Sequence, residues 1–184
     1  GVGKAGRGVV EFFRELPGLM LFIILVPFYR MAERNIIRVS LGICALAILG
    51  FLLAGPNMIP SVVFLVIWSI GDHMVMPVRK SYAIHSAEPG QEGRALGTLM
   101  GVENAGQVAG LGLVSLIFLV PGVKTDLNAG GRGGYVIVFI TILFFLFAGF
   151  LAAMGMARAE GGLERRKIYF HRKFMRFYGL EVFY

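Results

Sequence analysis

The chain has 184 residues, of which 57% are hydrophobic and 16% are charged, and it carries a formal net charge of +7. Soluble domains are roughly half apolar and about a quarter charged, so this composition, with a mean hydropathy of +0.74, excludes an ordinary water-soluble domain. The positive charge does not indicate a nucleic-acid partner, because the basic residues gather in short segments between apolar blocks, as in membrane proteins. The single cysteine, Cys44, excludes a disulfide framework and a cysteine-rich metal site.

The chain begins with a segment, 1–14, that is glycine-rich and basic before it becomes amphipathic. An apolar block over 15–31 follows, and Pro17 and Pro27 lie within it. We interpret 1–14 as a truncated amphipathic or loop start and 15–31 as a first membrane span. Three charged residues stand where the block begins: Glu11, Arg14 and Glu15. They either reach the lipid headgroups, as charges near helix ends readily do, or face a polar cavity.

Four longer apolar blocks follow, and a helix of about 20 residues is enough to cross a bilayer core. We predict spans over 36–54, 59–84, 96–120 and 135–157. Gly71 and Pro77 lie inside the second of these blocks and predict a bend in its helix. The last residues, 158–184, alternate basic side chains with Phe and Tyr, which is typical of a helix lying among headgroups.

The basic residues also predict the orientation, because positively charged segments stay on the cytoplasmic side of a membrane. They gather before the second span, around the turn between the third and fourth spans, and in the tail. The residues outside the tail are Arg30, Arg34, Arg38, Arg79, Lys80 and Arg94. We therefore predict a multi-pass protein of a plasma or inner membrane with a cytoplasmic C-terminus. Lys4 and Arg7 would then lie on the opposite side, against the rule.

Polar residues inside the spans are the candidate functional residues, since lipid disfavours them unless they face a protein interior or a wet cavity. Asp72 and His73 lie in the middle of the span over 59–84. An acid and an imidazole can carry protons in a transporter. Because the two are adjacent, they point about 100° apart around a helix, so both cannot face one narrow cavity. Alternatively, one of them caps a helix break near Gly71 or bonds a neighbouring backbone.

The span over 96–120 carries a second polar group, made of Glu103, Asn104 and Gln107. Glu103 and Gln107 are four residues apart and share a helix face. These side chains either line a path through the membrane or join helices by hydrogen bonds.

Glu33 stands where a helix is expected to begin, and an acid there meets the positive end of the helix dipole. The arginines around it can pair with it or with the ends of neighbouring helices. Such a cluster can hold helices together on one membrane face and release them when they move. Alternatively, the arginines only anchor the chain among headgroups.

The segment over 29–38, YRMAERNIIR, resembles the loop motif of the major facilitator superfamily, G-x-L-A-D-R-x-G-R-K. The residues that fall on its Leu, Ala, Asp, Arg and final basic positions are Met31, Ala32, Glu33, Arg34 and Arg38. Tyr29 and Ile36 replace its two glycines, and Ile37 stands where an arginine is usual. The segment over 71–101 is similar to a second pattern of the superfamily, a helix with Gly and Pro, a P-x-x-x-R-G-type turn and a Gly-spaced helix. The residues that carry that pattern are Pro89, Gly93, Arg94 and Gly97.

The resemblance implies an all-α, polytopic transmembrane bundle that forms part of one six-helix half of such a transporter. Five spans would match helices two to six, so the chain would be a fragment whose partners are the missing helices. The tail favours the C-terminal half, and the N-terminal half is almost as compatible.

The implied function is secondary active transport of a small solute by alternating access, coupled to protons or another ion. The path would contain Asp72, His73, Glu103, Asn104 and Gln107, and the cytoplasmic gate would contain Glu33, Arg34, Arg38 and Arg94. Arg94 could pair with Glu88 or Glu92. We expect no cofactor and no metal, because no phosphate loop or metal-ligand spacing occurs.

Two other classes of function remain open. A non-transporting membrane subunit would scaffold a larger complex through the Gly-rich helix and the basic tail. An integral membrane enzyme would use His73 or His85 with an acid, and would require the histidine and the acid to meet in space. We expect the chain not to be an enzyme.

Overall fold

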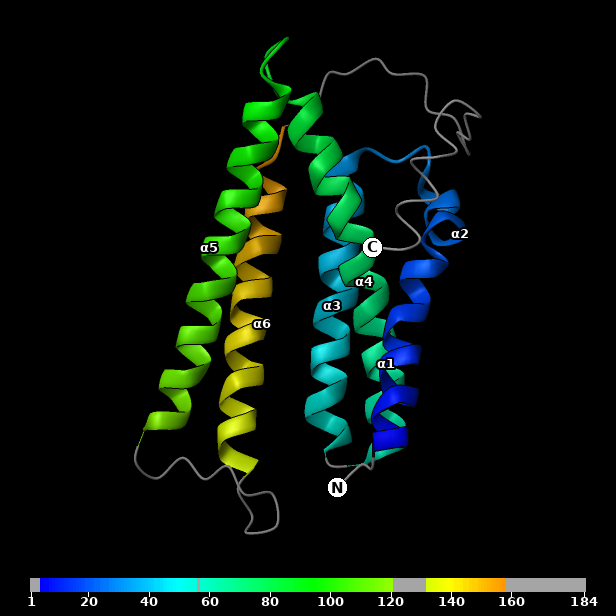
Figure 1. Cartoon of the computed structure of the whole chain (residues 1–184), viewed down its shortest axis with the longest axis vertical. Helices are drawn as coiled ribbons and strands as arrows, with labels where there is room; N and C mark the ends of the chain where they lie inside the picture. The colour runs from blue at the N-terminus through cyan, green and yellow to red at the C-terminus, as the bar shows by residue number, and fades with distance from the viewer. Residues whose placement is uncertain (1–3, 56, 121–131, 158–184) are drawn as a thin grey trace.

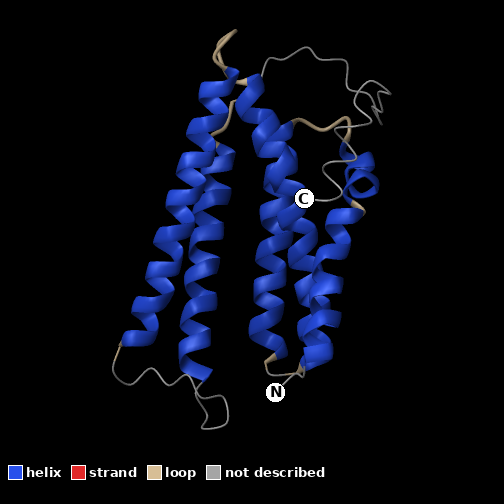
Figure 2. Ribbon diagram, in the orientation of Figure 1, coloured by secondary structure: helices blue, strands red, loops and turns tan. Residues whose placement is uncertain are grey.

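The computed structural model describes residues 4–55, 57–120 and 132–157, so the predicted tail over 158–184 lies outside the described residues. The described residues form six α-helices and one short 3-10 helix, which confirms the all-α prediction (Figure 2). The elements are α1 (Lys4–Leu19), α2 (Leu21–Leu25), η1 (Val26–Phe28), α3 (Glu33–Ala54), α4 (Met58–His85), α5 (Glu92–Leu119) and α6 (Arg132–Met154).

Four of these helices, α3 to α6, are long and apolar enough to cross a membrane, and they fit a multi-pass membrane protein. They overlap the four longer predicted spans, although α3, α5 and α6 begin three or four residues earlier than expected and α6 also ends three residues earlier. Successive helices run in opposite directions, and short turns join α3 to α4 and α4 to α5 (Figure 1).

The region predicted as the first span, 15–31, is not one helix. Its first residues belong to α1, and the chain then continues through the five residues of α2 and the 3-10 turn of η1. Pro27 lies in η1, where it has no N–H to continue an α-helix. Charged and apolar residues alternate along α1, so this element is less apolar than the four long helices, and it packs along α4 (Figure 1).

The core lies where α3 packs against α4 on one side and α6 on the other. Its buried apolar side chains are Ile36, Ile37, Met74, Val78 and Ala153. The backbones of α3 and α4 come unusually close at Gly71. A Cβ atom there would lie 2.6 Å from the Cys44 sulfur and 2.8 Å from the Ser40 carbonyl oxygen. Small residues at helix contacts permit this approach in membrane proteins, and α4 continues as one helix through Gly71 and Pro77.

Helix α5 packs much more loosely than the other long helices, and none of its residues is buried. A cavity of about 770 Å³ lies between parts of α3, α5 and α6, lined by residues such as Leu41, Gly110 and Phe145. A Cβ atom added at Gly97, Gly101 or Gly106 would meet nothing within 4 Å. The small residues of α5 are therefore not used for packing within the described part of the chain.

Candidate functional site

Ionisable side chains gather around the middle of α4 and bridge it to α1 and α5. Asp72 is the fifteenth of the 28 residues of α4, so it lies about 20 Å from either end at 1.5 Å per residue. Glu103 lies about 16 Å inside α5 by the same rise. We call the following six side chains the charged layer: Arg14, Glu15, Asp72, His73, Arg79 and Glu103.

One contact of the charged layer joins α4 to α5. The Arg79 guanidinium donates a hydrogen bond to the Glu103 carboxylate, and the two side chains are 29% and 20% exposed. Arg79 was counted among the basic residues that mark the cytoplasmic side, and the structure shows that its side chain pairs with α5 from within α4. The buried Nε of Arg79 has no hydrogen-bond partner within the described residues. The ion pair with Glu103 is therefore the main compensation for its charge.

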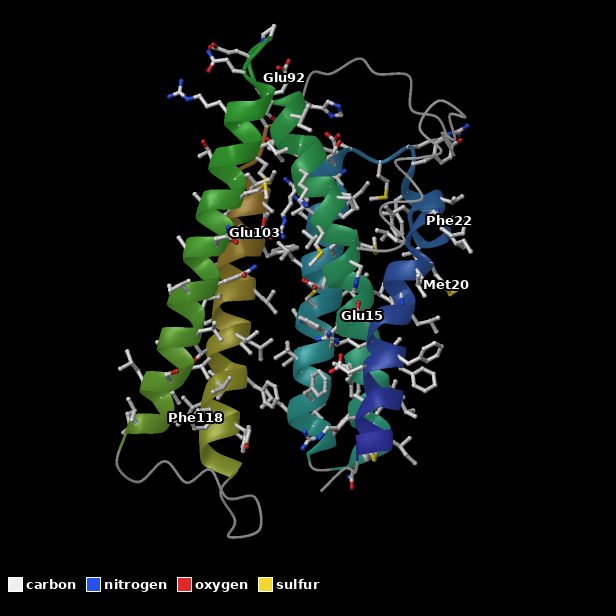
Figure 3. The ribbon with its side chains drawn as sticks, in the orientation of Figure 1. Glu15, Met20, Phe22, Glu92, Glu103 and Phe118 are labelled. Atoms are coloured by element: carbon white, nitrogen blue, oxygen red, sulfur yellow. The ribbon has the colours of Figure 1, made fainter. Side chains whose placement is uncertain are left out.

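The opposite contact of the charged layer joins α4 to α1 through His73. Its Nδ1 donates to the Ser69 carbonyl oxygen at 2.9 Å, because a carbonyl oxygen only accepts. Its Nε2 lies 3.6 Å from a Glu15 carboxylate oxygen, so protonation of the ring would complete an ion pair. Ser69 donates to the Arg14 carbonyl oxygen, and Arg14 pairs with Glu15 at 2.7 Å. Figure 3 shows Glu15 on α1 and Glu103 on α5.

Gly18 allows α1 to approach the His73 ring. A Cβ atom at Gly18 would lie 2.7 Å from both Cδ2 and Nε2 of His73. A larger residue at this position would displace the ring or push α1 away from α4, so Gly18 fixes the contact geometry.

Asp72 lies between these two contacts and belongs to neither. Its carboxylate is half-buried and interacts electrostatically with four side chains of the charged layer: His73, Arg79, Glu103 and Arg14. Within the described residues it makes no hydrogen bond and no ion pair. His73 reaches α1, whereas Asp72 is within electrostatic range of the α4–α5 pair, in keeping with the 100° between adjacent helix positions.

The structure brings together only part of the predicted path. Asp72, His73 and Glu103 lie in the charged layer, whereas Asn104 and Gln107 are exposed on α5. Neither amide makes a side-chain hydrogen bond to a described residue. Glu103 pairs with Arg79 of α4, whereas Asn104, about 100° further around the helix, is exposed.

A second polar cluster lies at the end of the bundle where α3 begins and α4 and α6 end. The Glu33 carboxylate is buried there and accepts hydrogen bonds from Ser81 at 2.8 Å and from Nδ1 of His85 at 2.6 Å. Arg38 donates from Nε and a terminal nitrogen to the Ala153 and Met154 carbonyl oxygens, each at 2.9 Å.

Further donors complete the same end of α6. Arg34 donates to the Met156 carbonyl oxygen at 3.3 Å, and Tyr82 to the Ala157 carbonyl oxygen at 3.2 Å. The last carbonyl groups of a helix have no partner within the helix, so Arg38 of α3 supplies partners to α6, and Arg34 and Tyr82 hold the residues that follow it. Three of the four predicted gate residues, Glu33, Arg34 and Arg38, thus join helices.

The fourth predicted gate residue, Arg94, lies apart from this cluster. It is exposed in the first turn of α5, and its contact is with the side-chain oxygen of Gln91 at 3.5 Å. Glu88 accepts from Gln91, and Glu92 accepts from the backbone N–H of Gly90. The acids considered as partners of Arg94 therefore stabilise the turn itself.

Several residues of these two sites were not identified from the sequence: Arg79, Ser69 and Ser81 as partners, and His85 as a partner of Glu33. Arg79 and Ser69 lie at a helical spacing from predicted path residues, and Ser81 lies at such a spacing from His85, which the sequence singled out only for the enzyme hypothesis. Arg79 is seven positions after Asp72, Ser69 four before His73, and Ser81 four before His85. Spacings of four and seven place side chains on one helix face.

A histidine and an acid do meet in space, as the enzyme hypothesis requires, but the order of atoms differs from that of a nucleophile triad. In a triad the acid orients one ring nitrogen and the serine bonds the other. Here Ser81 and Nδ1 of His85 share one oxygen of Glu33. The described residues also contain no group of three His, Cys, Asp or Glu side chains suited to a metal ion. Compared with known proteins, the chain matches no family profile, no curated protein and no solved structure.

Proposed function

We propose that this chain is part of a secondary active transporter of the major facilitator type, which moves a small solute by alternating access. The observation that carries the proposal is the charged layer in the middle of an otherwise apolar bundle. Ionisable residues inside membrane spans are rare and mark ion or substrate pathways. Asp72, half-buried and without an ion-pair partner in the described residues, is the side chain that we assign to the coupling proton or ion.

The unequal packing of the helices also supports this function. Helices α3, α4 and α6 form a close-packed group, whereas α5 touches the rest mainly through α4. The Arg79–Glu103 pair bridges that loose contact. In alternating access one group of helices rocks against another around a midplane site, and the α4–α5 contact is where we place that movement. The exposed face of α5 would pack against the remaining helices of the transporter. In this proposal the chain forms most of one six-helix half of the transporter, and we favour the C-terminal half.

The end of the bundle that holds Glu33, Arg34 and Arg38 would be the cytoplasmic gate, in a plasma or inner membrane, with the end of the chain also in the cytoplasm. Joining the starts and ends of three helices is what a gate requires. The resemblance of 29–38 to the superfamily loop motif assigns the same residues to that role.

Water access to α5 tests this proposal without knowledge of the substrate. In the full-length protein with Cys44→Ala, we would introduce Gln107→Cys as the path position and Phe144→Cys as the control. Phe144 is 66% exposed on the strongly apolar α6, where we expect lipid. Because the reactive form of cysteine is the hydrated thiolate, a charged, membrane-impermeant thiol reagent should modify Gln107→Cys and leave Phe144→Cys unmodified.

A scaffold subunit predicts the opposite outcome. It would bury the face of α5 against a partner or lipid, so both cysteines would resist the reagent. It would also leave solute accumulation by the full-length protein unchanged in Asp72→Asn, whereas a coupled transporter would lose accumulation. Resistance of Gln107→Cys in intact cells and in inverted vesicles alike would overturn the transporter proposal.

A further inference from the structure

Three charged side chains, Glu11, Arg14 and Glu15, form a group on α1 that we call the α1 charged face. Arg14 pairs with Glu11 at 2.9 Å and with Glu15 at 2.7 Å. Residues three or four positions apart are neighbours on a helix surface, so the three side chains share one face. The side chains of Glu11, Arg14 and Glu15 are 58%, 41% and 55% exposed. The described residues therefore leave much of this charged face uncovered.

The contacts of α1 with α4 place the α1 charged face deep within the bundle. A carboxylate oxygen of Glu15 lies 3.6 Å from Nε2 of His73. His73 is the sixteenth of the 28 residues of α4, so it lies about 18 Å from the nearer end of that helix. Helix α3 gives the same level, because Gly71 of α4 lies against Cys44, the twelfth of the 22 residues of α3. Glu15 is thus level with the middle of two candidate membrane spans.

This depth excludes one of the two environments that the sequence left open for these charges, the lipid headgroups. The hydrocarbon core of a bilayer is about 30 Å thick, so its middle lies about 15 Å from either headgroup region. Glu11 is four residues from Glu15, or about 6 Å along the helix, and therefore still lies about 9 Å inside the hydrocarbon. A glutamate side chain, with only two methylene groups, is too short to reach the headgroups from there. The remaining environment is a polar cavity.

The opposite face of α1 is apolar at the same depth. Val9, Phe12 and Phe13 are 54%, 57% and 41% exposed. Val9 is two positions before Glu11, so the two side chains point about 200° apart around the helix. An amphipathic helix at a membrane surface lies flat, with its charged side in water, whereas α1 packs lengthwise along α4 (Figure 1). Its two faces therefore require two different surroundings at one level of the membrane.

We propose that the α1 charged face lines a water-filled cavity at mid-depth in the membrane. Ionisable side chains inside membrane spans face a protein interior or a wet cavity, and this face is only partly covered by protein. The cavity would adjoin α4 beside His73, where the contact with Glu15 sets the rotation of α1. The inference rests on the proposed function in making this cavity part of the solute path, and it adds Glu11 to the residues of that path.

Collision rates of spin labels test the proposal, because they distinguish water, lipid and protein as the surroundings of a side chain. The full-length protein with Cys44→Ala, in lipid nanodiscs, would carry one label at Glu11→Cys or at Val9→Cys. A neutral, water-soluble nickel chelate reports water, and oxygen, which concentrates in hydrocarbon, reports lipid. We expect the ratio of nickel to oxygen collision rates to be about tenfold higher at Glu11→Cys than at Val9→Cys, because hydrocarbon excludes polar solutes.

The two labelled positions form a matched pair. They are exposed to a similar extent in the structure, 58% for the Glu11 side chain and 54% for Val9. Val9 lies about 3 Å closer to the membrane surface, so depth alone would give the opposite order. Glu11→Cys also keeps the ion pair between Arg14 and Glu15, so the packing of α1 on α4 should persist. The exposed Phe144→Cys of α6 supplies the reference for lipid.

Two results would overturn the inference. Low collision rates with both reagents at Glu11→Cys would mean that protein covers the α1 charged face, and a ratio equal to that of Phe144→Cys would mean that lipid does. The outcome is distinct from that of the thiol test on α5. A modified Gln107→Cys with a dry Glu11→Cys would retain the transporter and remove α1 from its path. A wet Glu11→Cys with a resistant Gln107→Cys would retain the cavity and overturn the proposed function.

Discussion

The Arg79–Glu103 ion pair should contribute measurably to the stability of the bundle, and its contribution can be isolated by a double-mutant cycle. Glu103→Gln leaves the Arg79 guanidinium without its counter-charge, and Arg79→Gln leaves the Glu103 carboxylate without its own. Removing one partner of a fully buried pair costs about 3–5 kcal/mol. Since the two side chains are 29% and 20% exposed, solvent screening lowers our expectation to about 2 kcal/mol for each single variant.

The double variant Arg79→Gln/Glu103→Gln carries two neutral amides, which can hydrogen-bond to each other. It should therefore lose only about 1 kcal/mol, less than the sum of the single variants, and the coupling energy should be about 3 kcal/mol. The free energy of unfolding can be measured in mixed micelles by adding a denaturing detergent and following the fluorescence of Trp68, the single tryptophan of this chain.

The matched control for this cycle is Arg94→Gln. Arg94 is exposed, and its contact with Gln91 is 3.5 Å long, so the change should stay within about 0.5 kcal/mol, as for most surface substitutions. If the single variants lost no more stability than Arg94→Gln, or if the double variant equalled their sum, the pair would not join α4 to α5 as the structure indicates.

Two other predictions concern helix contacts. Gly71→Ala should destabilise the bundle by about 1–3 kcal/mol in the same unfolding assay, because the added Cβ would meet Ser40 and Cys44 of α3. Gly101→Ala is the control, because its Cβ would have no atom within 4 Å. It should leave the free energy of unfolding unchanged or raise it by up to about 1 kcal/mol. Equal effects at the two glycines would contradict the close approach of α3 and α4. Arg38→Gln should cost about 1–3 kcal/mol and increase hydrogen exchange at the end of α6, because two carbonyl groups lose their donor. Unchanged exchange there would show that α6 does not depend on α3 for its C-terminal partners.

The four long helices could be predicted from the sequence because each is an apolar block of sufficient length between polar turns, and hydropathy detects that pattern. The break in the helix over 15–31 could not be predicted in this way, because average hydropathy does not detect a backbone turn. Met20 ends the regular part of α1 with φ −91° and ψ 7°, and Pro27 sets a 3-10 turn instead of another α-helical turn. Figure 3 shows Met20 and Phe22 on the outer side of the bundle, where they are 43% and 63% exposed.

The sequence identified individual polar residues within the spans, but it could not predict which of them pair with each other. Which side chains meet depends on how α4 is rotated against α1 and α5, and spacing within one helix does not determine that rotation. Arg79 illustrates the difficulty, because the sequence indicated only a basic residue on the cytoplasmic side, whereas its side chain pairs with Glu103 of α5. Gln107 shares a helix face with Glu103, yet no described element covers it.

Asp72 should behave oppositely to Glu103 when its charge is removed. In the charged layer, Arg14 is paired with Glu15 and Arg79 is paired with Glu103, so Asp72 is the acid that has no arginine partner among the described residues. The half-buried carboxylate of Asp72 therefore carries an excess negative charge in the middle of the bundle. An unpaired charge held in such a place destabilises a protein, so Asp72→Asn should raise the free energy of unfolding by about 1 kcal/mol, whereas Glu103→Gln lowers it.

A side chain that lowers the stability of the fold is expected at positions where function requires it. In the proposed transporter, the same Asp72→Asn protein should bind its solute but fail to accumulate it, because the proton or ion that balances Asp72 has lost its site. Measuring unfolding and solute accumulation on one preparation separates the two roles. A less stable Asp72→Asn protein would mean that Asp72 is a structural partner of the charged layer, and the assignment of the coupling ion to this carboxylate would fall.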